Sequence, residues 1–315
     1  MVSRRRLGDA VEDAAGVAER LAVLLGAGVA PASVWGYLID DSAVGSARGD
    51  PLGDRLRLID AAARTGRDVA PAIVGALSDA HGEDAWRAVA AAWIVSSESG
   101  APMGPALRAF STALRAIVHS RREVDVALAG PLLSSRIVLA LPLVAIGLGA
   151  ALGFDVLGVL FGSITGFVCL VVGATLAGVA VWWVARLTAA ARRADPSPGL
   201  NADLVAIAMG GGVSAERAVA LVEEALALVD LPGGASTAVD GILAVSRRAG
   251  VPAGELLRSE AESERRRART EGARRAARLG SLLMLPLGVC VLPAFIVLGI
   301  VPMVLSLLSS TGLAW

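Results

Sequence analysis

The amino-acid sequence predicts an all-α membrane protein with two cytoplasmic helical-bundle domains and three transmembrane helices. Hydrophobic residues make up 55% of the 315 residues, and the mean hydropathy of +0.65 is too high for an ordinary soluble protein. Apart from Asp155, charged residues are confined to about 1–136 and 186–278. Apolar residues in these charged segments recur at spacings of three and four, which is typical of helices.

The first charged segment, residues 1–131, is expected to form a cytoplasmic domain of about six helices. Two of these helices should end in left-handed caps, at Gly28 and Gly100. A cluster of Asp, Ser, Gly and Pro at 40–51 predicts a loop. The basic N-terminus is followed at once by acidic residues, beginning with Asp9, so no cleavable signal peptide is expected.

A long apolar run follows this domain. The 49 residues between Arg136 and Arg186 carry one charge, that of Asp155. A helix needs about 20 apolar residues to cross a bilayer, so residues 132–186 are expected to form a transmembrane hairpin that turns near Asp155.

Three glycines in the hairpin stretch "GVLFGSITG" are candidates for helix packing. Gly158, Gly162 and Gly166 recur at a spacing of four, which would place them on one helix face. Small residues at this spacing let two membrane helices approach closely, and we favour this role over binding of a ligand.

A third transmembrane helix is expected at 279–310, with a short external tail at 311–315. The run from Leu279 to the C-terminus has no charged side chain. It contains Pro286, Pro293 and Pro302, and prolines are tolerated in membrane helices, where they can bend the axis.

The arginines predict how the chain is oriented. Cytoplasmic ends of membrane helices are enriched in Arg and Lys, and all 29 basic residues of this chain are Arg. Both charged segments and the N-terminus are therefore expected in the cytoplasm, with the C-terminus outside the plasma membrane. The arginines that flank the three spans are Arg121, Arg122, Arg136, Arg186, Arg192, Arg193, Arg265, Arg266, Arg267, Arg269, Arg274, Arg275 and Arg278.

The second charged segment, residues 187–278, resembles a reduced copy of the first, with about four helices. The stretch "SGAPMGPALR" at 99–108 aligns with "AGVPAGELLR" at 249–258, and "GAGV" at 26–29 aligns with "GGGV" at 210–213. The two alignments differ in offset, so the second copy lacks about two helices.

Candidate catalytic groups are few. The chain has no Lys, which excludes a P-loop lysine and a Schiff base, and neither His81 nor His119 has a second ligand at metal-binding spacing. No ionisable residue except Asp155 falls in an apolar run, which argues against a proton or ion pathway. We therefore expect no enzyme activity, no cofactor, no metal site and no nucleic-acid partner, with membrane lipid as a partner.

The helix "SEAESERRRARTEGARRAAR" at 259–278 has two interpretations. Its i, i+4 pairs, such as Glu262 with Arg266, support one long helix that continues into the third span. The same charges, from Glu262 through Arg265, Arg266 and Arg267, could also form an electrostatic docking surface for a partner.

Taken in order, "LLGAGV", "ESGAP", a hairpin, a second such domain and "LPLGVCVLPAFIVLGIVP" resemble the type II secretion F family, and most closely its Tad/Flp pilus members. The resemblance implies a non-catalytic platform protein of a pilus or secretion machine. Its helical domains would sit on a hexameric cytoplasmic ATPase, and its spans would meet pilin or pseudopilin subunits. A paralogue of the family or a homo-oligomer could complete the platform.

The resemblance also indicates docking residues. The family's acidic Gly-Glu-x-x-Gly element corresponds to Ser97, Glu98, Ser99 and Gly100, with Ser in place of the first Gly, and the second copy reads "RRAG" without an acid. We therefore expect Glu98, Gly100 and Pro102 to contact a partner. A membrane-anchored scaffold or signalling adaptor is the alternative, and a small transporter is a more distant one.

Overall fold

The computed structural model describes residues 2–40, 51–77, 83–152, 156–191, 198–232 and 237–310. No strand occurs among these residues, which confirms the all-α class. Most of the predicted loop at 40–51, the turn at Asp155, His81 and the tail at 311–315 lie outside the described residues. The chain divides into unit 1, residues 1–121 with 195–269, and unit 2, residues 122–194 with 270–315.

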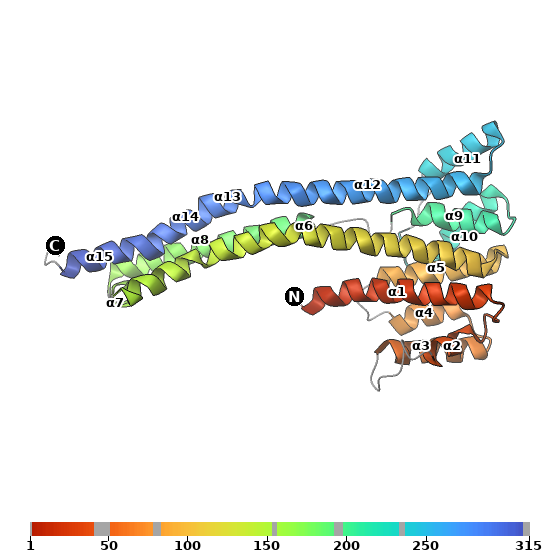
Figure 1. The fold of residues 1–315 in the computed structure, drawn as a ribbon, viewed down its shortest axis with the longest axis horizontal. Helices are drawn as coiled ribbons and strands as arrows, with labels where there is room; N and C mark the ends of the chain where they lie inside the picture. The colour runs from red at the N-terminus through yellow and green to blue at the C-terminus, as the bar shows by residue number, and fades with distance from the viewer. Residues whose placement is uncertain are drawn as a thin grey trace. The chain divides into compact units, whose positions relative to one another are not determined.

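Unit 1 contains the charged helices of both halves of the chain (Figure 1). Its helices are α1 (Val2–Gly26), α2 (Val34–Asp40), α3 (Pro51–Arg64), α4 (Val69–Leu77), α5 (Glu83–Ser99), the first part of α6 (Met103–Ala151), α9 (Leu200–Gly210), α10 (Ala215–Leu228), α11 (Thr237–Ala249) and the first part of α12 (Ala253–Leu282).

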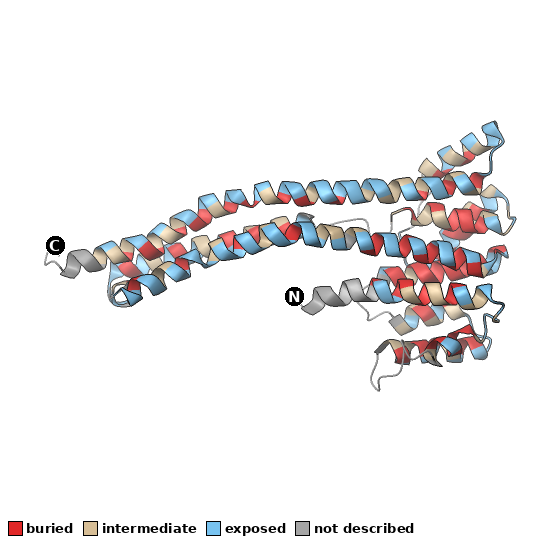
Figure 2. Cartoon of the chain, viewed as in Figure 1, coloured by how far each residue is buried: buried red, intermediate tan, exposed pale blue. Residues whose placement is uncertain are grey.

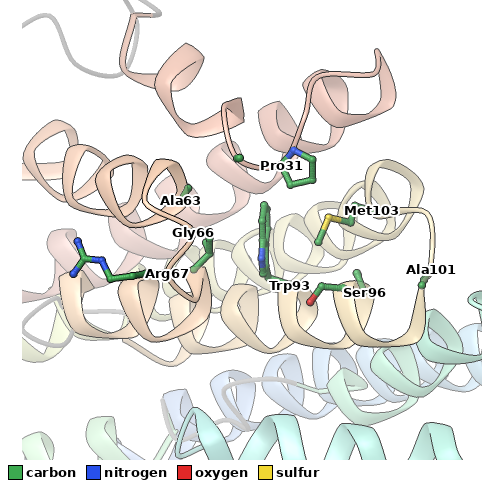
Figure 3. A pocket seen from close by; sticks show the side chains of 12 residues that line it. Pro31, Ala63, Gly66, Arg67, Trp93, Ser96, Ala101 and Met103 are labelled. Carbon is green, nitrogen blue, oxygen red and sulfur yellow. The ribbon is translucent and has the colours of Figure 1, made fainter.

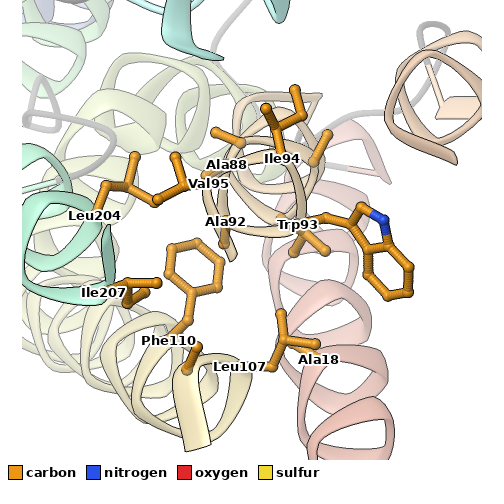
Figure 4. Packing of buried hydrophobic residues seen from close by; sticks show 14 of the residues in the cluster. Ala18, Ala88, Ala92, Trp93, Ile94, Val95, Leu107, Phe110, Leu204 and Ile207 are labelled. Carbon is orange, nitrogen blue, oxygen red and sulfur yellow. The ribbon is translucent and has the colours of Figure 1, made fainter. Parts of the chain in front are cut away.

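Helix α5 forms the centre of unit 1, because it packs against α1, α4, α9 and α10. Its sequence is rich in alanine, and Ala88 and residues 90–92 are buried (Figure 2). Small side chains allow neighbouring helices to approach on several sides. Side chains from three other helices surround α5 (Figure 4): Ala18 of α1, Leu107 and Phe110 of α6, and Leu204 and Ile207 of α9.

One hydrophobic core therefore joins residues of the two segments that the sequence predicts as separate domains. Polar contacts join them as well. The guanidinium of Arg87 on α5 donates to the backbone oxygen of Asp230, at 2.8 Å, and to its carboxylate, at 3.1 Å. Asp230 follows α10 and has a positive φ of 54°.

The glycines expected to cap helices have the backbone conformation that this role requires. Gly28 has φ of 91° and Gly100 has φ of 71°, which confirms both left-handed caps. Their aligned counterparts in the second segment, Gly212 and Gly250, have φ of 86° and 66°.

Unit 2 contains the apolar helices. They are the second part of α6, α7 (Val156–Gly162), α8 (Ile164–Ala191), the end of α12, α13 (Met284–Pro286), η1 (Leu287–Val291), α14 (Leu292–Phe295), η2 (Ile296–Ile300) and α15 (Val301–Ser310). Three helical runs, Met103–Ala151, Ile164–Ala190 and Ala253–Leu305, are long and apolar enough to cross a membrane by length and composition. The three predicted spans thus have counterparts in the structure.

The three runs pack against each other in successive layers along unit 2. The first layer joins Leu128 of α6, Val184 of α8 and Leu279 of α12. The second joins Val138 and Leu139 of α6, Ala180 of α8, and Cys290 and Val291 of η1. The third joins Ile146, Leu160, Leu170 and Leu298.

Two of the three prolines in the third run, Pro293 and Pro302, are preceded by a π-helical turn. A proline ring collides with the carbonyl four residues earlier in an α-helix, and for Pro293 and Pro302 these carbonyls belong to Val289 in η1 and Leu298 in η2. The wider turns are closed by i+5 hydrogen bonds, such as that from the Leu292 N–H to the Leu287 oxygen. The helical run therefore continues past both prolines.

Candidate docking surfaces

The first predicted docking element lies at the end of α5 in unit 1. Glu98 and Pro102 are exposed, and the left-handed Gly100 ends the helix. Ser99 is buried between them. Its hydroxyl donates to the Val95 oxygen at 2.6 Å and accepts from the Ala101 N–H at 3.3 Å, so the side chain closes the turn. Of these residues, Glu98 and Pro102 face solvent and Ser99 has a structural role.

A cavity of about 510 Å³ lies beside this turn (Figure 3). Trp93 lines it, and its ring centroid is 5.4 Å from that of buried Trp35. The hydroxyls of Ser96 and Ser97 donate to backbone oxygens one turn back, at 2.7 and 3.0 Å. Because these hydroxyls are already bonded to the backbone, the cavity is suited to binding an apolar group rather than to catalysing a reaction. Its lining also includes Pro31, Ala32, Ala63, Gly66, Arg67, Val69, Gly100, Ala101 and Met103.

The same turn packs against the second segment on its other side. A Cβ at Gly211, in the turn after α9, would collide with the backbone oxygen of Ser99 and would lie 2.9 Å from the Ala101 nitrogen. In the sequence, Gly211 stands out only as part of the aligned stretch "GGGV". The alignment of the two segments does not predict that the backbone of α5 packs directly against Gly211.

In the second predicted docking element, on α12, one side chain is buried inside unit 1 and the others are exposed. Arg265 donates to Asp203 of α9 at 2.5 Å, and both side chains are largely buried. Arg266 and Arg267 are exposed, and they pair loosely with Glu262 at 3.2 Å and Glu260 at 3.6 Å. Arg266, Arg267 and Glu262 thus remain on the surface, whereas Arg265 joins two helices inside unit 1.

The carboxylate of this ion pair, on Asp203, has a shifted pKa. Burial raises the pKa of Asp203 above its ordinary value of 3.8, while the charge of Arg265, its hydrogen bond and the charge of Arg258 act to lower it. The net direction is upward, so desolvation outweighs the arginines. An acid in this position has a structural explanation, because it joins α9 to α12.

In unit 2, the three predicted packing glycines lie on two helices rather than on one face. Helix α7 ends at Gly162, and the Ser163 hydroxyl accepts from the Gly166 N–H at 3.0 Å, so Ser163 caps the start of α8. A Cβ at Gly166 would collide with the Val159 backbone, whereas one at Gly162 would meet nothing within 4 Å; Gly158 is exposed.

Separate spans also approach closely at two glycines that the sequence analysis did not select. A Cβ at Gly173 of α8 would overlap the Leu298 side chain of η2. A Cβ at Gly299 would lie 2.7 Å from the Ala145 Cβ of α6. Single glycines in an apolar helix have no spacing motif, which explains why the sequence did not reveal them.

No group of three or more His, Cys, Asp or Glu that could hold a metal ion occurs in the part of the chain that the structure describes. Cys169 and Cys290 are not joined in a disulfide.

Comparison with known protein families gives one match. The family model described as type II secretion system (T2SS), protein F, matches residues 17–150. The match supports the type II secretion F family. Proteins of that family are non-catalytic membrane platforms of secretion and pilus systems. No curated protein and no solved structure gives a significant match to the chain.

The type II secretion F match covers one docking element and leaves the other outside. It extends from within α1 almost to the end of α6, so it includes Glu98, Gly100 and Pro102. Glu262, Arg265, Arg266 and Arg267 follow the matched region. Together with the three apolar helices, the match indicates an inner-membrane protein.

Proposed function

We propose that the chain is the platform protein of a Tad/Flp or type IV pilus, or of a type II secretion machine, which couples a hexameric cytoplasmic ATPase to the extraction and assembly of pilins. The observation that carries the proposal is the match at 17–150, which includes both the α5 docking turn and the first apolar span. A protein with this role needs surfaces and spans but no catalytic residues.

The mechanism follows from how two helices are divided between the units. Both α6 and α12 contribute residues to charged unit 1 and to apolar unit 2. ATP-driven movement of the ATPase bound to unit 1 would therefore be passed along these continuous helices. In unit 2 this movement would help hydrophobic pilin helices to leave the bilayer.

We also infer that the chain contains two copies of one helical module, 1–131 and a reduced 187–278, with a hairpin at 132–186 and a third span at 279–310. The equivalent backbone conformations of the aligned glycines support this duplication: Gly28 with Gly212, and Gly100 with Gly250. The arginine distribution supports a cytoplasmic N-terminus and an external C-terminus.

Binding to a purified hexameric secretion-type ATPase tests the platform role, with the full chain in detergent or nanodiscs. Glu98→Arg should weaken binding by about tenfold or more, since reversing a charge at a docking surface adds repulsion to lost attraction. Glu223→Arg is the matched control, because Glu223 is an exposed acid on α10. Equal affinities for both variants and the wild type would count against docking at α5.

The charged face of α12 is tested in the same assay. Arg266→Glu with Arg267→Glu should weaken binding, whereas Arg247→Glu with Arg248→Glu, on the exposed end of α11, should not. Absence of a secretion-type ATPase and of short pilin-like genes from the neighbourhood would favour the scaffold or adaptor alternative.

A further inference from the structure

At one end of its apolar helices, unit 2 has more positive than negative side chains. Its described residues include six arginines and three carboxylates, Glu123, Asp125 and Glu271. Four of the arginines are exposed and have no ion pair with a described residue: Arg136 of α6, Arg186 of α8, and Arg274 and Arg278 of α12. We refer to these four arginines as the arginine collar.

The collar residues lie at one level because the helices that carry them pack together there. Arg186 lies between Val184 and Leu187, and Arg278 precedes Leu279, in the first packing layer. Arg136 lies between the first layer and the second, which begins at Val138. Arg274 lies just before Ala276 of the first layer. Because Gly272 lies beside Val124 and Gly280 beside Pro131, the four residues lie within about three helical turns of one another along the bundle.

The collar lies at the boundary between the charged part and the uncharged part of each of the three runs. Beyond it, the described residues 137–152, 156–185 and 279–310 contain no charged side chain. Their large apolar side chains are exposed, for example Ile137, Val144 and Leu285. In a bilayer these side chains would face hydrocarbon, and the collar would lie at the level of the lipid headgroups.

An aromatic side chain marks the same level. Trp182 is 60% exposed, and the Arg186 guanidinium carbon lies 5.4 Å from the centre of its ring. An exposed indole next to a cation is typical of the membrane–water interface, because the ring is apolar and the N–H is polar. This contact also orients one collar guanidinium over the α8 surface.

We propose that the arginine collar is a binding surface for the phosphate headgroups of anionic phospholipids in the leaflet around unit 2. Guanidinium groups donate two parallel hydrogen bonds to phosphate oxygens, and no carboxylate in the described part of the chain pairs with these four. Basic residues close to an anionic leaflet are attracted by its negative surface potential. The proposal requires only that the apolar helices lie in a bilayer, and it does not depend on coupling to an ATPase.

Electron spin resonance of the reconstituted full chain tests the proposal. The protein is placed in phosphatidylcholine bilayers that contain trace spin-labelled phosphatidylglycerol or spin-labelled phosphatidylcholine, and the motionally restricted fraction of each is measured. The wild type should prefer phosphatidylglycerol by about two- to fivefold. The preference should shrink at high salt, because the Debye length falls from about 10 Å at 0.1 M to about 3 Å at 1 M.

Two variants with four substitutions each test whether the preference for phosphatidylglycerol depends on the collar. Arg136→Gln, Arg186→Gln, Arg274→Gln and Arg278→Gln together should abolish the preference. The same number of substitutions in unit 1, at Arg57, Arg217, Arg247 and Arg248, should retain it, since these side chains are exposed but lie outside unit 2. Equal loss in both variants would overturn the proposal, as would a wild type with no preference.

A charge-preserving variant covers the case in which the Gln variant fails to fold. Lys at all four collar positions keeps the positive charge and should keep most of the preference. If this variant folds, by its helical circular dichroism, and shows no preference for phosphatidylglycerol at all, the electrostatic explanation is wrong.

Discussion

Arg265 of α12 and Asp203 of α9 form an ion pair of 2.5 Å in which the two side chains are 16% and 14% exposed. The neighbours of Arg265 in sequence, Arg266 and Arg267, are 64% and 74% exposed. Three consecutive arginines therefore have two different roles. One joins helices of unit 1, and the other two lie on the surface.

Removal of the inward arginine should destabilise unit 1. Arg265→Ala leaves the Asp203 carboxylate buried without its strongest partner, which should cost about 3 kcal/mol. Arg267→Ala removes only an exposed pair and should cost at most about 0.5 kcal/mol. Thermal unfolding of the full chain in detergent, followed by circular dichroism, measures both. Equal unfolding midpoints for the two variants would show that the Asp203 pair contributes nothing.

Stability should depend on pH through Asp203 in an unusual direction. Its pKa is raised in the folded state, so between its ordinary value of 3.8 and the folded pKa the folded protein binds more protons than the unfolded chain. The free energy of unfolding that Asp203 contributes therefore falls as pH rises through that window and is level above it. A lowered pKa would give the opposite slope.

Asp203→Asn removes the titration and provides the comparison. As pH is lowered from 7 towards about 4, the difference in unfolding midpoint between the wild type and Asp203→Asn should shift in favour of the wild type. A shift in favour of the variant would mean that the arginines outweigh burial at this carboxylate.

The inward position of Arg265 could have been predicted from the sequence. Leu257 and Ala261 are fully buried on α12, and Arg265 is the next residue of that i, i+4 row. A charge that continues an apolar row indicates a buried partner, but the sequence does not show that the partner is Asp203, on another helix. The three spans were predictable for a simpler reason, because exclusion of charge is a local property of each run.

The arrangement of the hairpin was only partly predictable. Ser163 precedes the apolar run of α8, and a serine in this place is a common N-cap, so a helix break was visible in "GSITG". The regular glycine spacing suggested one continuous face instead. The close contacts at Gly173 and Gly299 depend on how α6, α8 and the third run pack, which no local pattern encodes.

The contact between the two segments of unit 1 should be sensitive to a single methyl group. Gly211→Ala places a Cβ against the backbone of Ser99 and Ala101, which cannot move aside as a flexible side chain would, so about 1–3 kcal/mol of stability should be lost. Gly210→Ala is the matched control, because nothing lies within 4 Å of its Cβ position. Alanine there should be neutral or stabilising by up to about 1 kcal/mol. Equal unfolding midpoints would place the α9–α10 turn away from α5.

The packing of the second span on the third can be tested with a double-mutant cycle. Gly173→Ala directs a Cβ into the Leu298 side chain and should destabilise unit 2 by about 1–3 kcal/mol, whereas Gly178→Ala on the same helix meets nothing within 4 Å and should not. Leu298→Ala removes the side chain that the new methyl group would strike. In the Gly173→Ala and Leu298→Ala double variant, the cost of the Gly173 change should therefore largely disappear, with a coupling energy of about 1–2 kcal/mol. Additive losses in thermal unfolding would mean that α8 and η2 do not meet at these residues.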